Sequence, residues 1–221
     1  MDNLRKLSEV WRSHLDESDT LDDHEFSFFP VFLTLARAAH RILEIGAGRG
    51  RMAKVLTSHG VKATIVCLDI NDYVSEAPGL PVIADTRLLP FKDGAFDLVY
   101  SLGVVEHIEE TGRAIAEHIR VTRKKGYALI TTPHLSIYTP LRWIVWFLKY
   151  RKKGSFKSLM GSNLSIRQVK KWLLAAGGAV YRYGGCGSFL PGPLKAIRKY
   201  IKNFIPERYL GAYLWCLARR I

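Results

Sequence analysis

Three glycines at alternate positions follow a short apolar stretch near residue 45. The segment reads RILEIGAGRG, so Gly46, Gly48 and Gly50 come directly after residues typical of a buried strand. Glycine lacks a Cβ atom, so the backbone of such a turn can approach a ligand closely, and free N–H groups at the start of the next helix can point at it. The turn therefore predicts a binding site for a nucleotide-like ligand.

The spacing of these glycines excludes two common nucleotide sites. A phosphate-binding P-loop needs Lys followed by Ser or Thr after its last glycine, and GRGRMA has neither. The dinucleotide fingerprint needs its third glycine at the position where Arg51 stands. What remains is a GxGxG turn with Glu44 two residues before its first glycine.

Two further acids end predicted strands. Asp69 closes the segment ATIVCLD, and Asp85 follows PVIA. A carboxylate has two oxygens and can accept hydrogen bonds from two vicinal hydroxyls. Acids at strand ends can also cap helices in any parallel α/β protein, so their meaning depends on the whole set being in register.

The elements that must position these residues alternate between β-rich and helical segments. Predicted strands lie at 41–45, 63–69, 81–84, 96–100 and 127–132, with helical or turn segments at 50–60, 71–77 and 111–126. The last of these segments is expected to end as a helix in basic residues and Gly126. Near-continuous apolar strands that alternate with helices predict a parallel sheet covered on both faces.

Additional helices and strands are expected before and after this core. We expect one or two helices in the first 40 residues, a helix at 165–178 with Ser165 as N-cap, and strands near 179–184 and 211–219. The prediction is a single domain over 1–221. Its parts are an N-terminal helical cap (1–40), a cofactor-binding core (41–133) and two helical lid inserts (134–164 and 189–208).

The glycine turn, the three acids and the segment PFKDGAFDLVYSLGVVEHI together resemble one family. They look like the class I S-adenosylmethionine-dependent methyltransferases, and within them the ubiquinone and menaquinone branch. The resemblance is close over 40–135 and general over 164–221. It implies an α/β, Rossmann-like, seven-stranded, mostly parallel sheet of order 3-2-1-4-5-7-6, with inserts after strands 5 and 6. It also implies an enzyme that uses S-adenosylmethionine and releases S-adenosylhomocysteine.

The resemblance implies a role for each matching residue. Glu44 would help hold the methionyl amino group, Asp69 would accept both ribose hydroxyls, and Asp85 would take the adenine amino group. The other expected cofactor-binding residues are Gly46, Ala47, Gly48, Gly50, Ile70, Thr86, Arg87, Ser101 and Leu102. No metal is expected.

Two histidines lie where a general base could act. His134 follows the strand at 127–132, where an imidazole could reach an acceptor hydroxyl, although a structural role would explain it too. His107, in VEHIEE, has packing or capping of the next helix as its alternative. The remaining histidines are expected on the surface or on helix faces: His14, His24, His40, His59 and His118.

Charge divides the chain into two unlike halves. Residues 1–110 hold 18 acids and 11 bases, a net of −7, whereas residues 111–221 hold 2 acids and 22 bases, a net of +20. No acidic residue stands between Glu117 and Glu207. Such a stretch points to a polyanionic neighbour, either an anionic membrane surface or a nucleic acid.

The two inserts combine aromatic, aliphatic and basic residues. LRWIVWFLKYRKKG is apolar nearly all round with a basic end, and PLKAIRKYIKNFIPERY alternates apolar and basic faces. A basic amphipathic helix with aromatics is typical of an element lying on an anionic bilayer. The same helices would also suit a roof over an apolar acceptor pocket.

These observations give a leading function and two alternatives. The leading one is methyl transfer to a small, hydrophobic or lipid-linked acceptor at the membrane surface. The alternatives are an RNA methyltransferase that uses the basic half, and a cofactor-binding but non-catalytic subunit. SLGVVEH lacks the Asp/Asn-Pro-Pro-aromatic motif common in methyltransferases of base amino groups. With no apolar leader run and three cysteines without a CxxC pair, a cytoplasmic protein, peripheral to the membrane, is expected.

Overall fold

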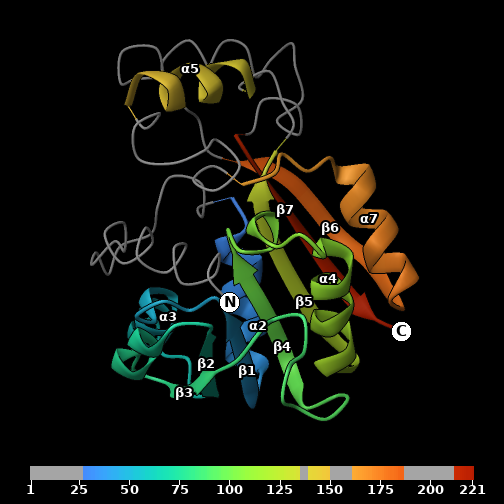
Figure 1. Ribbon diagram of the computed structural model, residues 1–221. Helices are drawn as coiled ribbons and strands as arrows, with labels where there is room; N and C mark the ends of the chain where they lie inside the picture. The colour runs from blue at the N-terminus through green and yellow to red at the C-terminus, as the bar shows by residue number, and fades with distance from the viewer. Residues whose placement is uncertain (1–26, 135–138, 150–160, 187–211) are drawn as a thin grey trace.

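A seven-stranded mixed sheet runs through the part of the chain that the computed structural model describes, residues 27–134, 139–149, 161–186 and 212–221 (Figure 1). Its order is β3-β2-β1-β4-β5-β7-β6, as the resemblance predicted. Among the strands that the structure describes, only the pairs that β7 makes with β5 and β6 are antiparallel. The strands are β1 (Arg41–Ile45), β2 (Thr64–Asp69), β3 (Leu80–Ile83), β4 (Phe96–Leu102), β5 (Thr122–Pro133), β6 (Gly178–Cys186) and β7 (Tyr213–Arg220).

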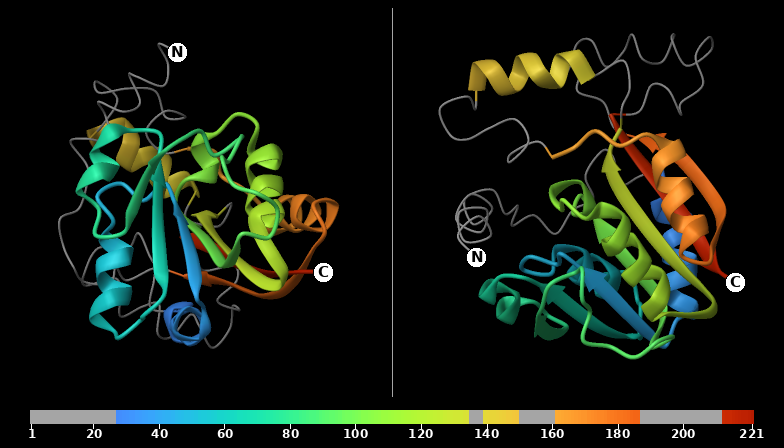
Figure 2. Two further views of the ribbon diagram at one scale, coloured as in Figure 1. Left: turned by 90° about the horizontal axis from the view of Figure 1, so that it is seen from below. Right: turned by 45° about the vertical axis from the view of Figure 1, so that its right-hand side comes forward.

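Helices cover both faces of this sheet (Figure 2). On one face, α2 (Phe29–Ala38) and α3 (Arg51–Ser58) pack in a cluster that includes Phe32 and Tyr100, whose rings meet edge to face at 4.9 Å. On the other face lie α4 (Thr111–Val121) and α7 (Ile166–Ala175). Two short 3₁₀ helices, η1 (Asp72–Glu76) and η2 (Val105–His107), follow β2 and β4. Burial on both faces explains why the central strands are apolar without alternation.

Helix α7 has the ends that its sequence predicted. Ser165 accepts a hydrogen bond from the Gln168 N–H, and the Gln168 side chain accepts one from the Ser165 N–H, which makes a capping box. The chain leaves the helix through Gly177, whose φ of 84° is left-handed. Both the N-cap and the glycine stop are thus confirmed.

The predicted helix over 111–126 is wrong in its last turn. Helix α4 ends at Val121, and Thr122 already pairs with Phe96 in the sheet. Lys125 has a φ of 63°, and a Cβ on Gly126 would lie 2.8 Å from the Asp97 carbonyl oxygen. The basic residues after α4 therefore belong to the irregular start of β5. The predicted strand at 127–132 is only the later part of that strand.

Helix α5 (Thr139–Lys149) lies beyond the carboxyl ends of β4 and β5 (Figure 1). The residues on either side of the segment that contains α5 are neighbours in space. His134 forms a parallel bridge with Leu164, and the Leu164 N–H donates to the Pro133 carbonyl at 3.2 Å. No helix among the described residues is long and apolar enough to cross a membrane. Three predicted parts lie outside the described residues: 1–26 of the helical cap, the basic exit of the first insert, and the second insert at 189–208.

Candidate functional site

The glycine turn after β1 adopts a backbone that only glycine takes easily. Gly46, Gly48 and Gly50 have φ values of 70°, 56° and 74°, all in the left-handed region. A Cβ on Gly46 would lie 2.3 Å from Cγ2 of Val104, and one on Gly50 would lie 2.6 Å from Cδ of Pro78. The turn is thus held close to the loop after β4 on one side and to the chain before β3 on the other.

Asp69 joins this turn to the end of β2. Its carboxylate is buried; Oδ2 accepts a hydrogen bond from the Gly48 N–H at 3.0 Å, and Oδ1 accepts from the backbone and side-chain nitrogens of Asn71, each at 3.0 Å. A carboxylate offers about four acceptor positions, so this one can still accept from a ligand hydroxyl. The next residue, Ile70, is 41% exposed at the same edge. These residues fit a nucleoside whose ribose meets Asp69.

Glu44 lies beneath the turn, on β1 between Cys67 of β2 and Tyr100 of β4. It is 5% exposed, and the Cys67 thiol donates to its Oε2 at 3.9 Å. Burial and the Glu44 charge raise the pKa of Cys67 to about 12, and the same two causes raise the pKa of Tyr100 well above its usual value. Both neighbours therefore stay protonated at neutral pH.

Asp85 is paired with Arg87 within the loop after β3. Nε and Nη2 of Arg87 donate to the carboxylate at 3.0 and 2.6 Å, and the Arg87 N–H adds a bond of 2.8 Å. This bonding lowers the pKa of Asp85. The hydroxyl of Thr86 is buried and has no hydrogen-bond partner among the residues that the structure describes. The loop thus offers a fixed acid and a buried hydroxyl at the position predicted for adenine.

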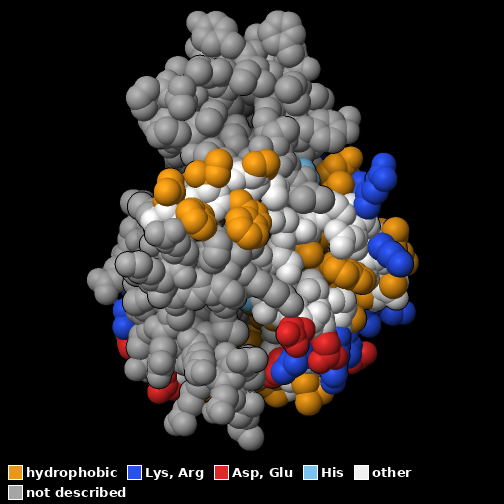
Figure 3. Space-filling model, turned by 45° about the horizontal axis from the view of Figure 1, so that its top comes forward, with side chains coloured by type: hydrophobic (Ala, Val, Ile, Leu, Met, Phe, Trp, Pro, Cys, Tyr) orange, Lys and Arg blue, Asp and Glu red, His pale blue; other side chains and the backbone are white. Residues whose placement is uncertain are grey.

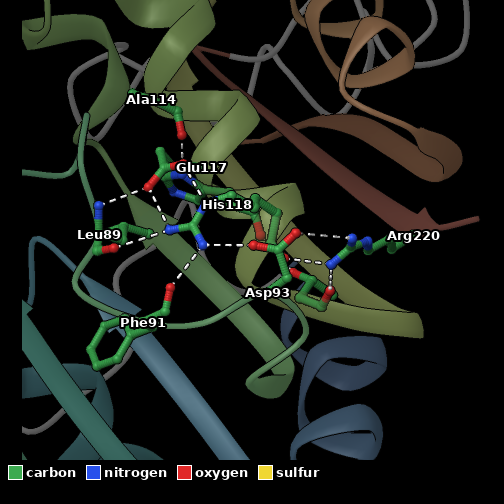
Figure 4. A network of polar contacts seen from close by, with 9 residues as sticks. Leu89, Phe91, Asp93, Ala114, Glu117, His118 and Arg220 are labelled. Carbon is green, nitrogen blue, oxygen red and sulfur yellow. Dashed lines mark hydrogen bonds and ion pairs between the residues drawn. The ribbon is translucent and has the colours of Figure 1, made fainter.

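Arg120 of α4 connects this loop to the body of the protein through Leu89, Phe91, Asp93 and Glu117, which are labelled in Figure 4. It donates to Glu117 at 2.6 and 2.8 Å, to the carbonyls of Leu89 and Phe91 at 3.0 and 2.7 Å, and to Asp93 at 2.9 Å. Glu117 in turn accepts the Leu89 N–H at 2.7 Å. The network positions the Asp85 loop, although nothing in its own sequence resembles a binding motif.

The hydroxyl of Ser101 does not face the carboxyl edge of the sheet. It is fully buried and lies 2.9 Å from Nε2 of His118, whose Nδ1 lies 2.8 Å from the Ala114 carbonyl. A carbonyl only accepts, so Nδ1 carries the proton and Nε2 accepts from Ser101. The cofactor contact predicted for Ser101 would therefore have to come from its backbone, and Leu102 follows it at the end of β4.

His118 lies on a helix face, as one of the two predicted placements had it, but this is the buried face of α4 and not the surface. Its side chain is fully buried, and burial lowers its pKa to about 4, so the imidazole is neutral. The signal was present in the sequence, because residue 118 continues the apolar spacing of Ala114 and Ile115 along α4.

The two histidines predicted as bases occupy different places. Nε2 of His107 lies 3.9 Å from Glu106, and its ring sits 3.1 Å from where a Cβ of Gly161 would stand, so His107 packs under the chain after residue 160. His134 is buried at the end of β5, where its backbone N–H donates to the Ala212 carbonyl at 3.0 Å. The packing of His107 and the burial of His134 suit a structural role, and the role of base stays a prediction for both.

A pocket of about 420 Å³ opens between the start of α4 and α7. Of the residues predicted to bind cofactor or act as base, only His107 lines it. The pocket therefore adds nothing to the cofactor site. Among the described residues, no group of three His, Cys, Asp or Glu could hold a metal ion.

The core of the chain matches known methyltransferases in sequence. Residues 43–130 match the family model described as "Methyltransferase domain". Over 95 residues the chain is 34% identical to malonyl-[acyl-carrier protein] O-methyltransferase of Geobacter sulfurreducens. That match covers 39% of this chain and 36% of the relative, so the chain spans little more than a third of the relative's length.

Solved structures match over a longer stretch. An S-adenosylmethionine-dependent methyltransferase from Mesorhizobium loti superposes with a TM-score of 0.63 at 18% identity, over 89% of this chain and 97% of that one. One from Archaeoglobus fulgidus gives 0.61 at 15% identity, over 88% and 92%. These likenesses establish the fold, and membership of the quinone branch stays a prediction. The fold is that of the class I S-adenosylmethionine-dependent methyltransferases, and the sequence match to a methyltransferase domain covers residues 43–130, which supports S-adenosylmethionine as the cofactor.

Proposed function

We propose that this protein transfers the methyl group of S-adenosylmethionine to a small, hydrophobic or lipid-linked acceptor at a membrane surface. The observation that carries the proposal is the position of α5. This helix carries exposed apolar side chains and lies beyond the carboxyl ends of β4 and β5, on the side of the sheet toward which β1 also ends (Figure 1). In an open α/β sheet, ligands bind at the carboxyl ends of the strands, so an acceptor at this edge would meet α5.

The described residues fit the cofactor at both ends. Asp69 would accept from the ribose hydroxyls, and Asp85 with Thr86 would face the adenine. The left-handed turn at Gly46 and Gly48 leaves room for the methionyl part, with Glu44 beneath it. The cofactor supplies a methyl group already activated on a sulfonium. The protein's own task is then to orient the acceptor and exclude water.

An oxygen acceptor would also need a base. His134 is our candidate, because β5 ends at the same edge as β1 and β4, and His134 directly follows it. A carbanion or thiolate acceptor would need no base, and His134 would then serve the packing described above.

RNA methylation is a second candidate, and the edge strand β6 favours it. Tyr181 and Tyr183 are exposed there, the Lys170 ammonium lies 3.6 Å from the Tyr183 ring centre, and Arg182 lies 5.6 Å from that of Tyr181. Exposed aromatic rings beside cations can stack on bases and follow a backbone. The apolar character of α5 has no counterpart in that function, so we rank it second.

Two measurements test the proposal. Calorimetry with S-adenosylhomocysteine should show binding in the wild type and a marked loss in Asp69→Ala. Methyl-labelled cofactor is then offered with a lipid extract or with total RNA. Label in the organic phase supports the proposal, and label in RNA supports the second candidate. Cofactor binding without transfer to either extract would favour a non-catalytic subunit.

A further inference from the structure

We propose that α5 docks the protein on an anionic bilayer through one apolar face, formed by Trp143, Ile144, Phe147 and Leu148. Their exposed fractions are 51%, 54%, 49% and 75%. The spacing i, i+1, i+4, i+5 puts all four on one side of a helix. This inference rests on the proposed function, because it names the surface at which the acceptor would be met.

The α5 apolar face is held at the functional edge of the sheet. Figure 3 shows hydrophobic side chains gathered over this helix, in the upper left of the described surface. The bridge between His134 and Leu164 fixes both ends of the segment at the carboxyl end of β5. A bilayer that contacts α5 would therefore lie on the side of the molecule where the strand-end acids are.

Charge complementarity selects an anionic surface. Along 139–153 the sequence carries Arg142, Lys149, Arg151, Lys152 and Lys153 and no acid, and no acid stands anywhere between Glu117 and Glu207. Each basic residue near an anionic leaflet adds attraction that falls off within a Debye length. With a net charge of +13, a second copy of the chain is a poor occupant for the same face.

The apolar face argues for lipid rather than nucleic acid. Ile144 and Leu148 are aliphatic, so they offer nothing to a phosphate backbone and no flat ring for a base, whereas both can enter the boundary between headgroups and acyl chains. At 11 residues α5 is too short to span a bilayer, which needs about 20. It would lie in the plane of the interface.

The test is flotation with vesicles of phosphatidylcholine alone or with 30% phosphatidylglycerol. Ile144→Ser/Leu148→Ser is compared with Leu80→Ser/Leu174→Ser, which changes two exposed apolar residues elsewhere, 57% and 60% exposed. We expect the wild type to float with anionic vesicles, the α5 variant to bind at least tenfold more weakly, and the control to stay within twofold. Quenching of tryptophan fluorescence by brominated lipid should fall in Trp143→Phe, which checks the site without altering the two aliphatic residues.

Two results would overturn the proposal. One is a wild type that ignores anionic vesicles; the other is an α5 variant that binds them as well as the control does. A further contrary result would come from competition with a 20-nucleotide single-stranded RNA. If the RNA displaced the wild type from the vesicles and bound the α5 variant and the control variant equally well, the basic half would be assigned to nucleic acid and not to lipid. Calorimetry with S-adenosylhomocysteine is run on every variant. Intact cofactor binding without vesicle binding removes the docking face and the membrane location but leaves methyl transfer standing, whereas absent cofactor binding removes methyl transfer and leaves the vesicle result to be read by itself.

Discussion

The carboxylate of Asp69 accepts a hydrogen bond from the Gly48 N–H at 3.0 Å. The acid that ends β2 thus fixes the turn that follows β1, which joins two parts of the predicted cofactor site. In the proposed site the same carboxylate would both order the backbone of the turn and accept hydrogen bonds from the ligand.

Asp69→Asn should weaken S-adenosylhomocysteine binding by about tenfold to a hundredfold, because hydrogen bonds to a charged group contribute about 1.5–3 kcal/mol. The amide keeps the shape of the side chain but loses the charge and one acceptor. Isothermal calorimetry measures the change. Asp72→Asn, at an exposed position three residues later, is the matched control and should bind within twofold of the wild type. Equal affinity of the two variants would remove Asp69 from the site.

Gly46→Ala should destabilise the fold and weaken cofactor binding. The left-handed conformation costs a non-glycine residue about 1–2 kcal/mol, and the new methyl would lie 2.3 Å from Val104. Urea unfolding of Gly46→Ala, Val104→Ala and the double variant separates the two causes. The double variant should recover part of the loss, because it removes the clash and leaves the backbone cost. Strict additivity of the two single changes would contradict the contact.

Stability should fall as the pH drops from about 6.5 to about 4 because of His118. Its pKa is about 4 in the folded protein, and a histidine in an unfolded chain titrates near 6.5. The unfolded state thus takes up the proton first, and the loss of unfolding free energy reaches roughly 3 kcal/mol at the low end.

Urea unfolding across this pH range measures the His118 effect. His118→Gln can still bond Ser101 but cannot titrate, so its stability should vary less with pH. His40→Gln changes an exposed histidine and should keep the wild-type pH profile. A wild type whose stability is constant between pH 6.5 and 4.5 would refute the buried neutral imidazole.

Arg120→Met should cost about 3 kcal/mol or more, because it leaves the largely buried Glu117 without its cation. The Asp85 loop also loses three carbonyl and carboxylate contacts, so S-adenosylhomocysteine affinity should fall with stability. Arg113→Met changes an exposed arginine that pairs only at the surface, and it should shift stability by less than about 1 kcal/mol. Thermal unfolding compares the variants. Equal shifts of the melting temperature in Arg120→Met and Arg113→Met would contradict the role given to Arg120.

The sequence predicted the architecture well because each strand carries its own signal. The apolar run 41–45 is β1 residue for residue, and the acids Asp69 and Asp85 end or follow the strands expected of them. The GxGxG spacing was informative because the three left-handed φ values strongly favour glycine at these positions. The need for a left-handed backbone at these three positions was thus visible in the amino-acid sequence.

The failures have physical causes as well. The start of β5 was missed because Arg123, Lys124 and Lys125 look like a helix C-terminus, while pairing with β4 is a contact that no local pattern reveals. The role of Arg120 was missed for the same reason, since it joins residues about thirty positions apart. The direction of the Ser101 side chain could not be predicted from the sequence either. Ser101 belongs to the motif, but its hydroxyl points toward His118 of α4.

The bridge between His134 and Leu164 has a consequence for how this protein can change. The two ends of the intervening stretch lie side by side, so lengthening, shortening or exchanging it costs little more than closing a loop of different length. Such an exchange would leave the sheet, the glycine turn and the strand-end acids unchanged. Under the proposed function, acceptor preference could therefore change through this one segment while the sheet and the glycine turn stay the same.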